Sequence, residues 1–254
     1  MKVAMMQPTF LPWQGFFELI YQTERFIILD DFQFSVQSYH QRNRLFVNKG
    51  QVDWYSVPIQ KSLSFGEQLN HTLINEIIPW RIKMWKRIQQ NYSKASCYPL
   101  ISPFIEKWLF EKQNSLAAQN IAFIKMACEL LCLKREFILS SASPSVNHRS
   151  TRVAELLRLS GADSYYCASG SFDYMLADGL FPLNNVKVFF QDFQPKAYPQ
   201  KGSKNSFIPY LSVLDAFMNI GPELTMNLIA KGTEKWLTWD EMKERRNNFL
   251  QGTA

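Results

Sequence analysis

The first 31 residues constrain most strongly which kind of sheet this chain can build. "KVAMMQ" at 2–7 and "RFIILDD" at 25–31 are short apolar runs, and "GFFELIYQT" between them has the length and apolar spacing of a helix. A strand, a helix and a second strand in this order are typical of a parallel sheet. Residues that follow such strands gather at the edge where ligands bind. Gln7, Asp30 and Asp31 are expected at that edge.

The same alternation returns in the second half of the chain. Strands are predicted at 136–141, 163–169 and 186–193, and helices at 150–160 and 209–223. The last helix is expected to stop at its Gly-Pro pair, Gly221 and Pro222.

The middle of the chain has a different pattern. Two β-rich runs within 44–59 flank a turn at 48–50 and predict a hairpin. Helical periodicity follows over 80–92 and again after Pro103, with a break at 114–115. The sequence therefore predicts a single compact α/β domain over residues 1–254, with a Rossmann-like parallel sheet and a mainly helical insertion at about 66–132.

The composition and net charge limit which substrates and binding partners are expected. The 254 residues are 46% hydrophobic and 15% aromatic, enough for a sizeable core. The net charge of +6 suits a small anionic substrate such as a nucleotide or sugar nucleotide. Because Lys and Arg are spread along the chain, no nucleic-acid partner is expected. The oligomeric state is left open.

The cysteines and the hydropathy of the sequence indicate in which cellular compartment the protein is expected. The four cysteines form no CxxC pair, so no metal site is predicted, and they suit small core thiols in a reducing cytosol. No run of about 18 apolar residues is present, so no membrane span is expected. A cytoplasmic protein is the expectation.

Asp30 and Asp31 are the first candidates for chemistry. They end an apolar strand, where a carboxylate can serve as a general base or as a magnesium ligand through phosphate. The structural alternative is that one of them caps a turn or pairs with an arginine.

His40, Arg42, Asn43 and Arg44 form a second cluster nine residues later. On a strand, Arg42 and Arg44 share one face, and guanidinium groups match phosphate or carboxylate with two donors. Two cations on one face need an anion between them. That anion is either a substrate or the carboxylate of Asp30 or Asp31, and the sequence leaves both open.

A third cluster begins the predicted helix at 150–160. His148, Arg149 and Arg152 place positive charge at the end of a helix that is already partly positive. A bound anion would relieve this conflict, and Ser150 or Thr151 is expected to cap the helix. The alternative is that the long side chains simply point into water.

Two further segments offer weaker signals. Ser169, Gly170 and Tyr174 lie in and after a small turn that follows the predicted strand at 163–169, which is a weak phosphate signal. Tyr198 and Gln200 lie in a glycine-containing loop that is either a lid or a surface loop.

Several motifs together resemble the WbqC-like protein family over nearly the whole chain. They are "MQPTFLPWQGFFELI", "FIILDDFQFSVQSYHQRNRL", the "SS" after "EFIL", "STRVAELLRLSGADSYYCASGSFDYM" and "YPQ…FIPYLSVLDAFMNIGPE". Members of this family are associated with bacterial O-antigen and related polysaccharide gene clusters, and glycine transfer to an amino sugar has been proposed for some of them.

The resemblance implies aminoacyl or acyl (glycyl) transfer onto an amino-sugar nucleotide. Phosphate or carboxylate would then be held by Arg42, Arg44 and Arg149, and Asn43 would orient the substrate. The catalytic residues would be Asp30, Asp31 or His40. Either Asp31 or His40 would take the proton from the attacking amine. The full expected substrate-binding set is Gln7, Trp13, Arg42, Asn43, Arg44, His148, Arg149, Arg152, Ser169, Gly170, Tyr174, Tyr198 and Gln200.

A second likeness, of "TFLPWQGFFELI" to nucleotidylyl transferases and pantothenate synthetases, implies an amide ligase that uses ATP, and Mg if required, through an acyl-adenylate. Neither histidine of that family's T-x-x-P-x-H-x-G-H motif is present. A third alternative is a nucleotide-binding scaffold subunit without catalysis.

Overall fold

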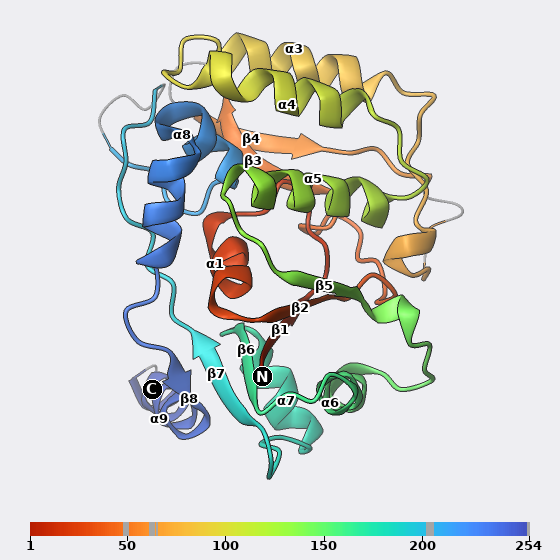
Figure 1. The fold of residues 1–254 in the computed structure, drawn as a ribbon, viewed down its shortest axis with the longest axis vertical. Coiled ribbons are helices and arrows are strands. Elements are labelled where there is room, and N and C mark those ends of the chain that lie inside the picture. The colour runs from red at the N-terminus through yellow and green to blue at the C-terminus, as the bar shows by residue number, and fades with distance from the viewer. Residues whose placement is uncertain (48–50, 61–63, 65, 202–205, 253–254) are drawn as a thin grey trace.

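Six strands form one sheet across the centre of the computed structural model, which describes residues 1–47, 51–60, 64, 66–201 and 206–252 (Figure 1). In spatial order they are β5 (Glu136–Leu139), β2 (Arg25–Ile28), β1 (Lys2–Met6), β6 (Ser164–Ala168), β7 (Lys187–Gln191) and β8 (Leu237–Thr238). Neighbouring strands are parallel except β8, which is antiparallel to β7. The predicted α/β fold with a Rossmann-like, mostly parallel sheet is confirmed.

Helices cover both faces of this sheet (Figure 1). α1 (Gln14–Gln22) and α8 (Val213–Ala230) lie on one face, and α6 (Arg149–Leu159), α7 (Ser171–Asp178) and α9 (Trp239–Gly252) lie on the other. Alternate residues of the strands supply the two cores. Ala4 packs toward α1, whereas Val3 and Met5 pack toward α6 and α7.

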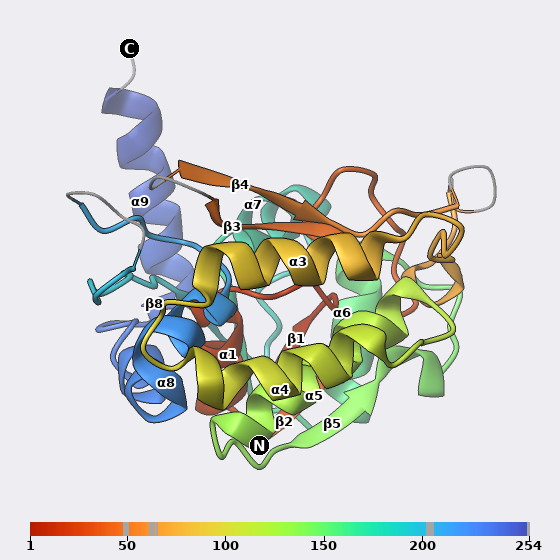
Figure 2. The ribbon, with the colours of Figure 1, turned by 90° about the horizontal axis from the view of Figure 1, so that it is seen from above.

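The segment between β2 and β5 adds a second layer over the α1 face. It contains the antiparallel hairpin of β3 (Arg42–Val47) and β4 (Gln51–Ser56), then η2 (Leu69–His71), α3 (Trp80–Tyr92), α4 (Tyr98–Phe110) and α5 (Leu116–Leu130). A short helix, η3 (Ser140–Ala142), follows β5 directly. Seen from above, α3 and α4 run side by side next to the hairpin (Figure 2). The predicted turn at 48–50 lies outside the described residues. That this segment is an insertion into one compact domain stays a prediction.

Two local expectations for the helices have clear outcomes. The predicted break at 114–115 is present, and the Ser115 hydroxyl accepts a hydrogen bond from the Ala118 N–H at 3.2 Å, which caps α5. The predicted stop at Gly221 and Pro222 is confirmed. Gly221 takes φ 76° and ψ 172°, which are not helical, so the first part of α8 ends there, and a second helical segment that begins at Pro222 follows across a kink and runs to Ala230.

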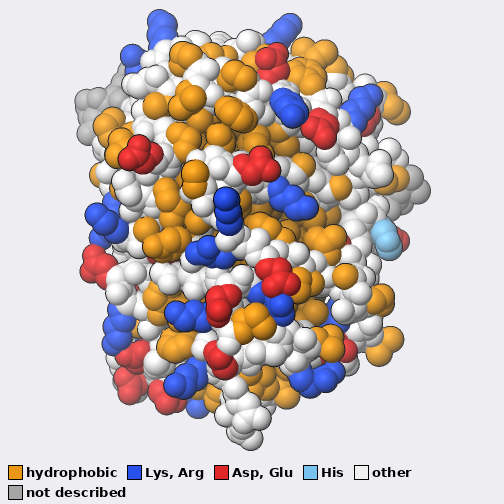
Figure 3. All heavy atoms as spheres, viewed as in Figure 1, with side chains coloured by type: hydrophobic (Ala, Val, Ile, Leu, Met, Phe, Trp, Pro, Cys, Tyr) orange, Lys and Arg blue, Asp and Glu red, His pale blue; other side chains and the backbone are white. Residues whose placement is uncertain are grey.

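The outer surface of the α3–α5 layer is partly apolar. Figure 3 shows hydrophobic side chains gathered over the upper half of the face where α4 and α5 lie, with acidic and basic groups interspersed. Among the described residues, no helix is both long and apolar enough to cross a bilayer.

Candidate functional site

The order of the strands reverses beside β1. From β1 the chain adds β2 and β5 on one side, and it then crosses over to place β6 and β7 on the other side. In doubly wound sheets, ligands bind outside the carboxyl ends of the strands at this reversal. The segments that follow β1 and β6 therefore occupy the position of a binding site in this fold class.

A pocket of about 430 Å³ lies directly beyond β1, and we call it the switch-point pocket. Its lining combines four aromatic rings with one cation and consists of Met6, Thr9, Trp13, Phe16, Tyr39, Asn43, Arg44 and Tyr210. Aromatic walls and a single guanidinium suit a planar ring that carries an anionic group.

Gly15 lets the indole of Trp13 reach this pocket. Trp13 immediately precedes α1 and has extended backbone. A Cβ atom at position 15 would lie 2.3 Å from the Trp13 ring, so any other residue would push the indole away. The rings of Phe193 and Tyr210 pack against the indole, with centroids 5.0 and 5.5 Å away. The indole is therefore held in place before any ligand arrives.

Arg44 is a cation with no anionic partner among the described residues. It is half-buried on β3, and its Nη2 makes only a long contact of 3.4 Å to the carbonyl oxygen of Tyr210. Its Nε is closed to solvent and donates no hydrogen bond. A guanidinium in this state has donors available for a phosphate or carboxylate.

Of the two alternatives for the anion beside the basic cluster, contact with Asp30 or Asp31 does not form. Arg42 lies over the Trp54 ring, with Cζ 4.3 Å from the ring centroid, and Arg44 faces the switch-point pocket. The two carboxylates instead contact groups after β5 and on α6. The carboxylate pair and the basic cluster are thus two separate clusters.

Asn43 and Asn120 hold the loop between β1 and α1. The Asn43 amide donates to the carbonyls of Phe10 and Leu11 at 3.2 and 2.7 Å, and its oxygen accepts the Arg44 N–H. Asn120, from α5, donates to the carbonyl of Pro8 at 2.9 Å. Since both amide hydrogens of Asn43 are used within the chain, its contacts are those of a residue that positions the pocket.

His40 is buried and neutral. Its Nδ1 accepts the N–H of Ser35 at 3.3 Å, so the ring proton lies on Nε2, which donates to Oε1 of Gln7 at 2.9 Å. Burial lowers the pKa of His40 to about 4. Both ring nitrogens are occupied, and the Gln7–His40 pair joins the end of β1 to the loop before β3.

Asp30 and Asp31 tie the end of β2 to the end of β5. Asp30 is buried and accepts hydrogen bonds from the N–H and hydroxyl of Ser141 at 3.0 and 2.6 Å. Asp31 accepts a short hydrogen bond from the Ser140 hydroxyl and pairs with Nη2 of Arg152 at 3.2 Å. The two serines that follow the strand are therefore the nearest partners of the two carboxylates.

Arg152 is the cation that these carboxylates meet. It is 3% exposed, and Nη2 also donates to the carbonyls of Ser140 and Ser143 at 2.8 and 2.6 Å. Its Nη1 pairs with Glu155 at 2.9 Å. Because its guanidinium is engaged on both sides, Arg152 fixes α6 to the edge of the sheet.

A second cavity, of about 550 Å³, opens beside this network, and we call it the amide cleft. Its lining consists of Asp31, Phe32, Gln33, Gly66, Gln68, Ser145, Asn147, His148, Arg149 and Arg152. The predicted site residues Asp31, His148, Arg149 and Arg152 are thus brought together here, whereas Trp13, Asn43 and Arg44 meet in the switch-point pocket.

The anion at the start of α6 is the protein's own carboxylate of Asp178, not a bound ligand. Asp178 pairs with Nη2 of Arg149 at 2.9 Å and accepts hydrogen bonds from the N–H and hydroxyl of Ser150 at 3.4 and 2.7 Å. These contacts hold the pKa of Asp178 below its usual range, with the Ser150 hydroxyl as the main cause. The expected capping by Ser150 or Thr151 is wrong, because the residue before α6 is His148 and its side chain makes no capping hydrogen bond.

Ser169, Gly170 and Tyr174 lie beyond β6 and line neither cavity. Gly170 precedes α7, and the Ser169 carbonyl accepts the N–H of Phe172 at 3.1 Å. Burial raises the pKa of Tyr174 to about 12. These contacts are those of the first turns of α7.

Tyr198 and Gln200 contact a buried carboxylate on α8. The Tyr198 hydroxyl and the Gln200 amide donate to Oδ2 of Asp215 at 2.6 and 3.0 Å, and Tyr92 donates to Oδ1 at 2.8 Å. Asp215 is fully buried, which raises its pKa. These four side chains join α3, α8 and the segment before α8.

Several residues of the two cavities were not predicted from the sequence. Tyr39 and Tyr210 line the switch-point pocket, and Gln33 and Gln68 line the amide cleft. Polar and aromatic residues in loops are common, so these carried no signal of their own. All four lie in loops, where binding residues are often found.

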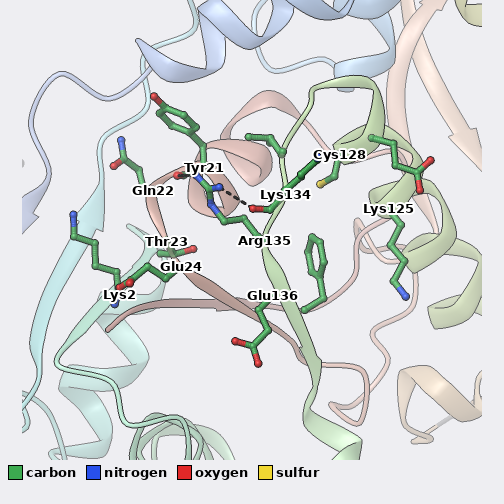
Figure 4. Close-up of a pocket in the computed structure, with 13 residues that line it drawn as sticks. Lys2, Tyr21, Gln22, Thr23, Glu24, Lys125, Cys128, Lys134, Arg135 and Glu136 are labelled. Carbon is green, nitrogen blue, oxygen red and sulfur yellow. Dashed lines mark hydrogen bonds between the residues drawn. The ribbon is translucent and has the colours of Figure 1, made fainter.

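A larger hollow, of about 900 Å³, lies at the opposite, amino edge of the sheet (Figure 4). Basic and acidic side chains alternate around it, and Arg135 donates to the carbonyls of Lys134 and Tyr21. Because α/β sheets bind ligands at the carboxyl edge, the hollow is not the candidate site.

Comparison with known proteins identifies the family to which the chain belongs. The model of the WbqC-like protein family matches residues 7–226, so the chain belongs to this family. An uncharacterized protein of Mycobacterium tuberculosis, Rv1507c, is 27% identical over 224 residues, which are 87% of this chain and 95% of that protein. No solved structure matches the chain.

Proposed function

We propose that this chain transfers an aminoacyl or acyl group, glycyl in the first instance, onto an amino-sugar nucleotide in the synthesis of a bacterial surface polysaccharide such as O-antigen. The switch-point pocket binds the nucleotide in this proposal. The family resemblance supplies the reaction class, and the geometry of the carboxyl edge supplies the roles of the residues.

The observation that carries the proposal is the guanidinium of Arg44, which has no anionic partner among the described residues and lies beside the aromatic walls of the switch-point pocket. A nucleotide satisfies both features at once, because its base stacks on Trp13 or Tyr210 and its phosphate accepts from Arg44. The position supports the same assignment, since nucleotides bind at the strand reversal of doubly wound sheets.

Asp31 is the favoured proton acceptor. The amine nitrogen of the amino sugar attacks the acyl carbonyl, the bond to the leaving group of the donor breaks, and the amine gives its proton to Asp31. The side chain of Asp31 is 15% exposed and lines a cavity, so a substrate reaches it. His40 is buried with both ring nitrogens occupied, which favours a positioning role for it.

A thermal-shift panel of ATP, UDP-sugars and dTDP-sugars, with and without magnesium, tests the proposal. A nucleotide at 100 times its dissociation constant adds about 2.7 kcal/mol of stability, so binding is visible. The proposal expects a shift with a sugar nucleotide and transfer of glycine without release of pyrophosphate. A shift with ATP alone, together with pyrophosphate release, would point to the amide ligase instead. Binding without any turnover would point to the scaffold.

A further inference from the structure

We infer that the amide cleft binds a hydroxyl-rich group without negative charge, the ring of an amino sugar, and not a phosphate. The identity of the sugar rests on the proposed function, whereas the exclusion of an anion rests on the cleft itself. Three features of its lining carry the inference.

Charge is the first feature. Each arginine that lines the cleft already has a carboxylate partner. Arg152 pairs with Asp31 and Glu155, and Arg149 pairs with Asp178. A phosphate would have to break one of these pairs, and for buried Arg152 this would leave a carboxylate without its counter-ion. The cleft thus differs from the switch-point pocket, where Arg44 has no anionic partner in the described part of the chain.

The arrangement of Gln33 and Gln68 is the second feature. These residues pair directly across an antiparallel bridge, so their side chains leave the backbone on the same face, with Cβ atoms about 5 Å apart. The pairing is continued by the N–H of Phe34 to the carbonyl of Glu67 at 2.9 Å. Both glutamines are exposed, and neither makes a side-chain hydrogen bond within the described part of the chain.

Two neighbouring amides match the chemistry of a sugar. Each amide offers an N–H donor and a carbonyl acceptor, and a hydroxyl group both donates and accepts. The half-buried ring of Phe32 provides an apolar surface for the C–H face of a pyranose. The volume of about 550 Å³ is ample for one monosaccharide.

Asp31 is the third feature. Its carboxylate reaches the cleft, and among the residues that the structure describes one cationic group, Arg152, pairs with it. Each carboxylate oxygen keeps lone-pair capacity beyond its present hydrogen bond. The ammonium or amine of an amino sugar is the group that would use this capacity, so the cleft orients the nucleophile toward its base.

Saturation-transfer NMR on the full chain, with glucosamine as the observed ligand and inorganic phosphate as the competitor, tests the inference. Glucosamine is expected to bind, and excess phosphate is expected not to displace it. In a Gln33→Ala/Gln68→Ala variant the glucosamine affinity should fall roughly tenfold, because two neutral hydrogen bonds are lost. Gln90→Ala, at an exposed position of α3, is the matched control and should leave the affinity unchanged.

Three results would overturn the inference: no binding of glucosamine to the wild type, displacement of glucosamine by phosphate, and unchanged glucosamine affinity in the double variant. Binding of UDP to the wild type separates this inference from the proposed function. If the wild type binds UDP but not glucosamine, the cleft assignment fails and the nucleotide site stands. If the wild type binds glucosamine as expected and binds no nucleotide, the proposed function fails and the cleft assignment stands.

Discussion

Protonation of His40 should destabilise the folded protein below neutral pH. Burial lowers the pKa of His40 from 6.5 to about 4, so its stabilising contribution is present above pH 6.5 and is lost as the pH falls toward 4. Between pH 7 and pH 4.5 this linkage costs about 2 kcal/mol, because the unfolded chain binds the proton and the folded chain resists it. The cause is the buried ring and its two occupied nitrogens.

The assay is urea denaturation of three proteins at pH 7 and pH 4.5. The wild type should lose about 2 kcal/mol more of its free energy of unfolding than a His40→Asn variant loses over the same interval. His71→Asn changes an exposed histidine and should follow the wild type. Equal losses in the wild type and His40→Asn would refute the reasoning, since other groups would then account for the whole pH dependence.

Three further substitutions test single features. Arg152→Met leaves the carboxylates of Asp31 and Glu155 without this counter-ion, so the free energy of unfolding measured in urea should fall by about 3–5 kcal/mol. The control Arg158→Met, at an exposed position of α6, should change that free energy by less than about 0.5 kcal/mol. Gly15→Ala displaces the Trp13 ring, so it should alter tryptophan fluorescence and abolish nucleotide binding, and an unchanged spectrum would contradict the packing. Gly221→Ala forces a side chain into φ 76°, so the melting temperature should fall by several degrees, corresponding to about 1–2 kcal/mol.

Local patterns were enough to predict five strands of the sheet, whereas the two-residue strand β8 was not predicted. The strand, helix and strand at 2–31 are each set by short-range apolar spacing, and the structure places them as predicted. The stop at Gly221 and Pro222 was predicted correctly, but the second helical segment of α8 that follows the kink was not predicted.

The partners of the site residues depended on strand order, which the sequence does not reveal. Asp31 meets Arg152, 121 residues further along, because β5 adds to the sheet beside β2 and brings α6 with it. The nearby Arg42 and Arg44 lie on a separate hairpin that turns away from the sheet. Tyr210 similarly joins the switch-point pocket from a segment far from Trp13.

Isothermal titration of UDP-sugars and dTDP-sugars into the wild type and an Arg44→Met variant tests the central claim most directly. We predict binding to the wild type and a roughly 10- to 100-fold weaker affinity for Arg44→Met, because a charged hydrogen bond contributes about 1.5–3 kcal/mol. Arg158→Met is the matched control and should bind as the wild type does. Equal affinities of the wild type and folded Arg44→Met would contradict the assignment of the switch-point pocket to a nucleotide.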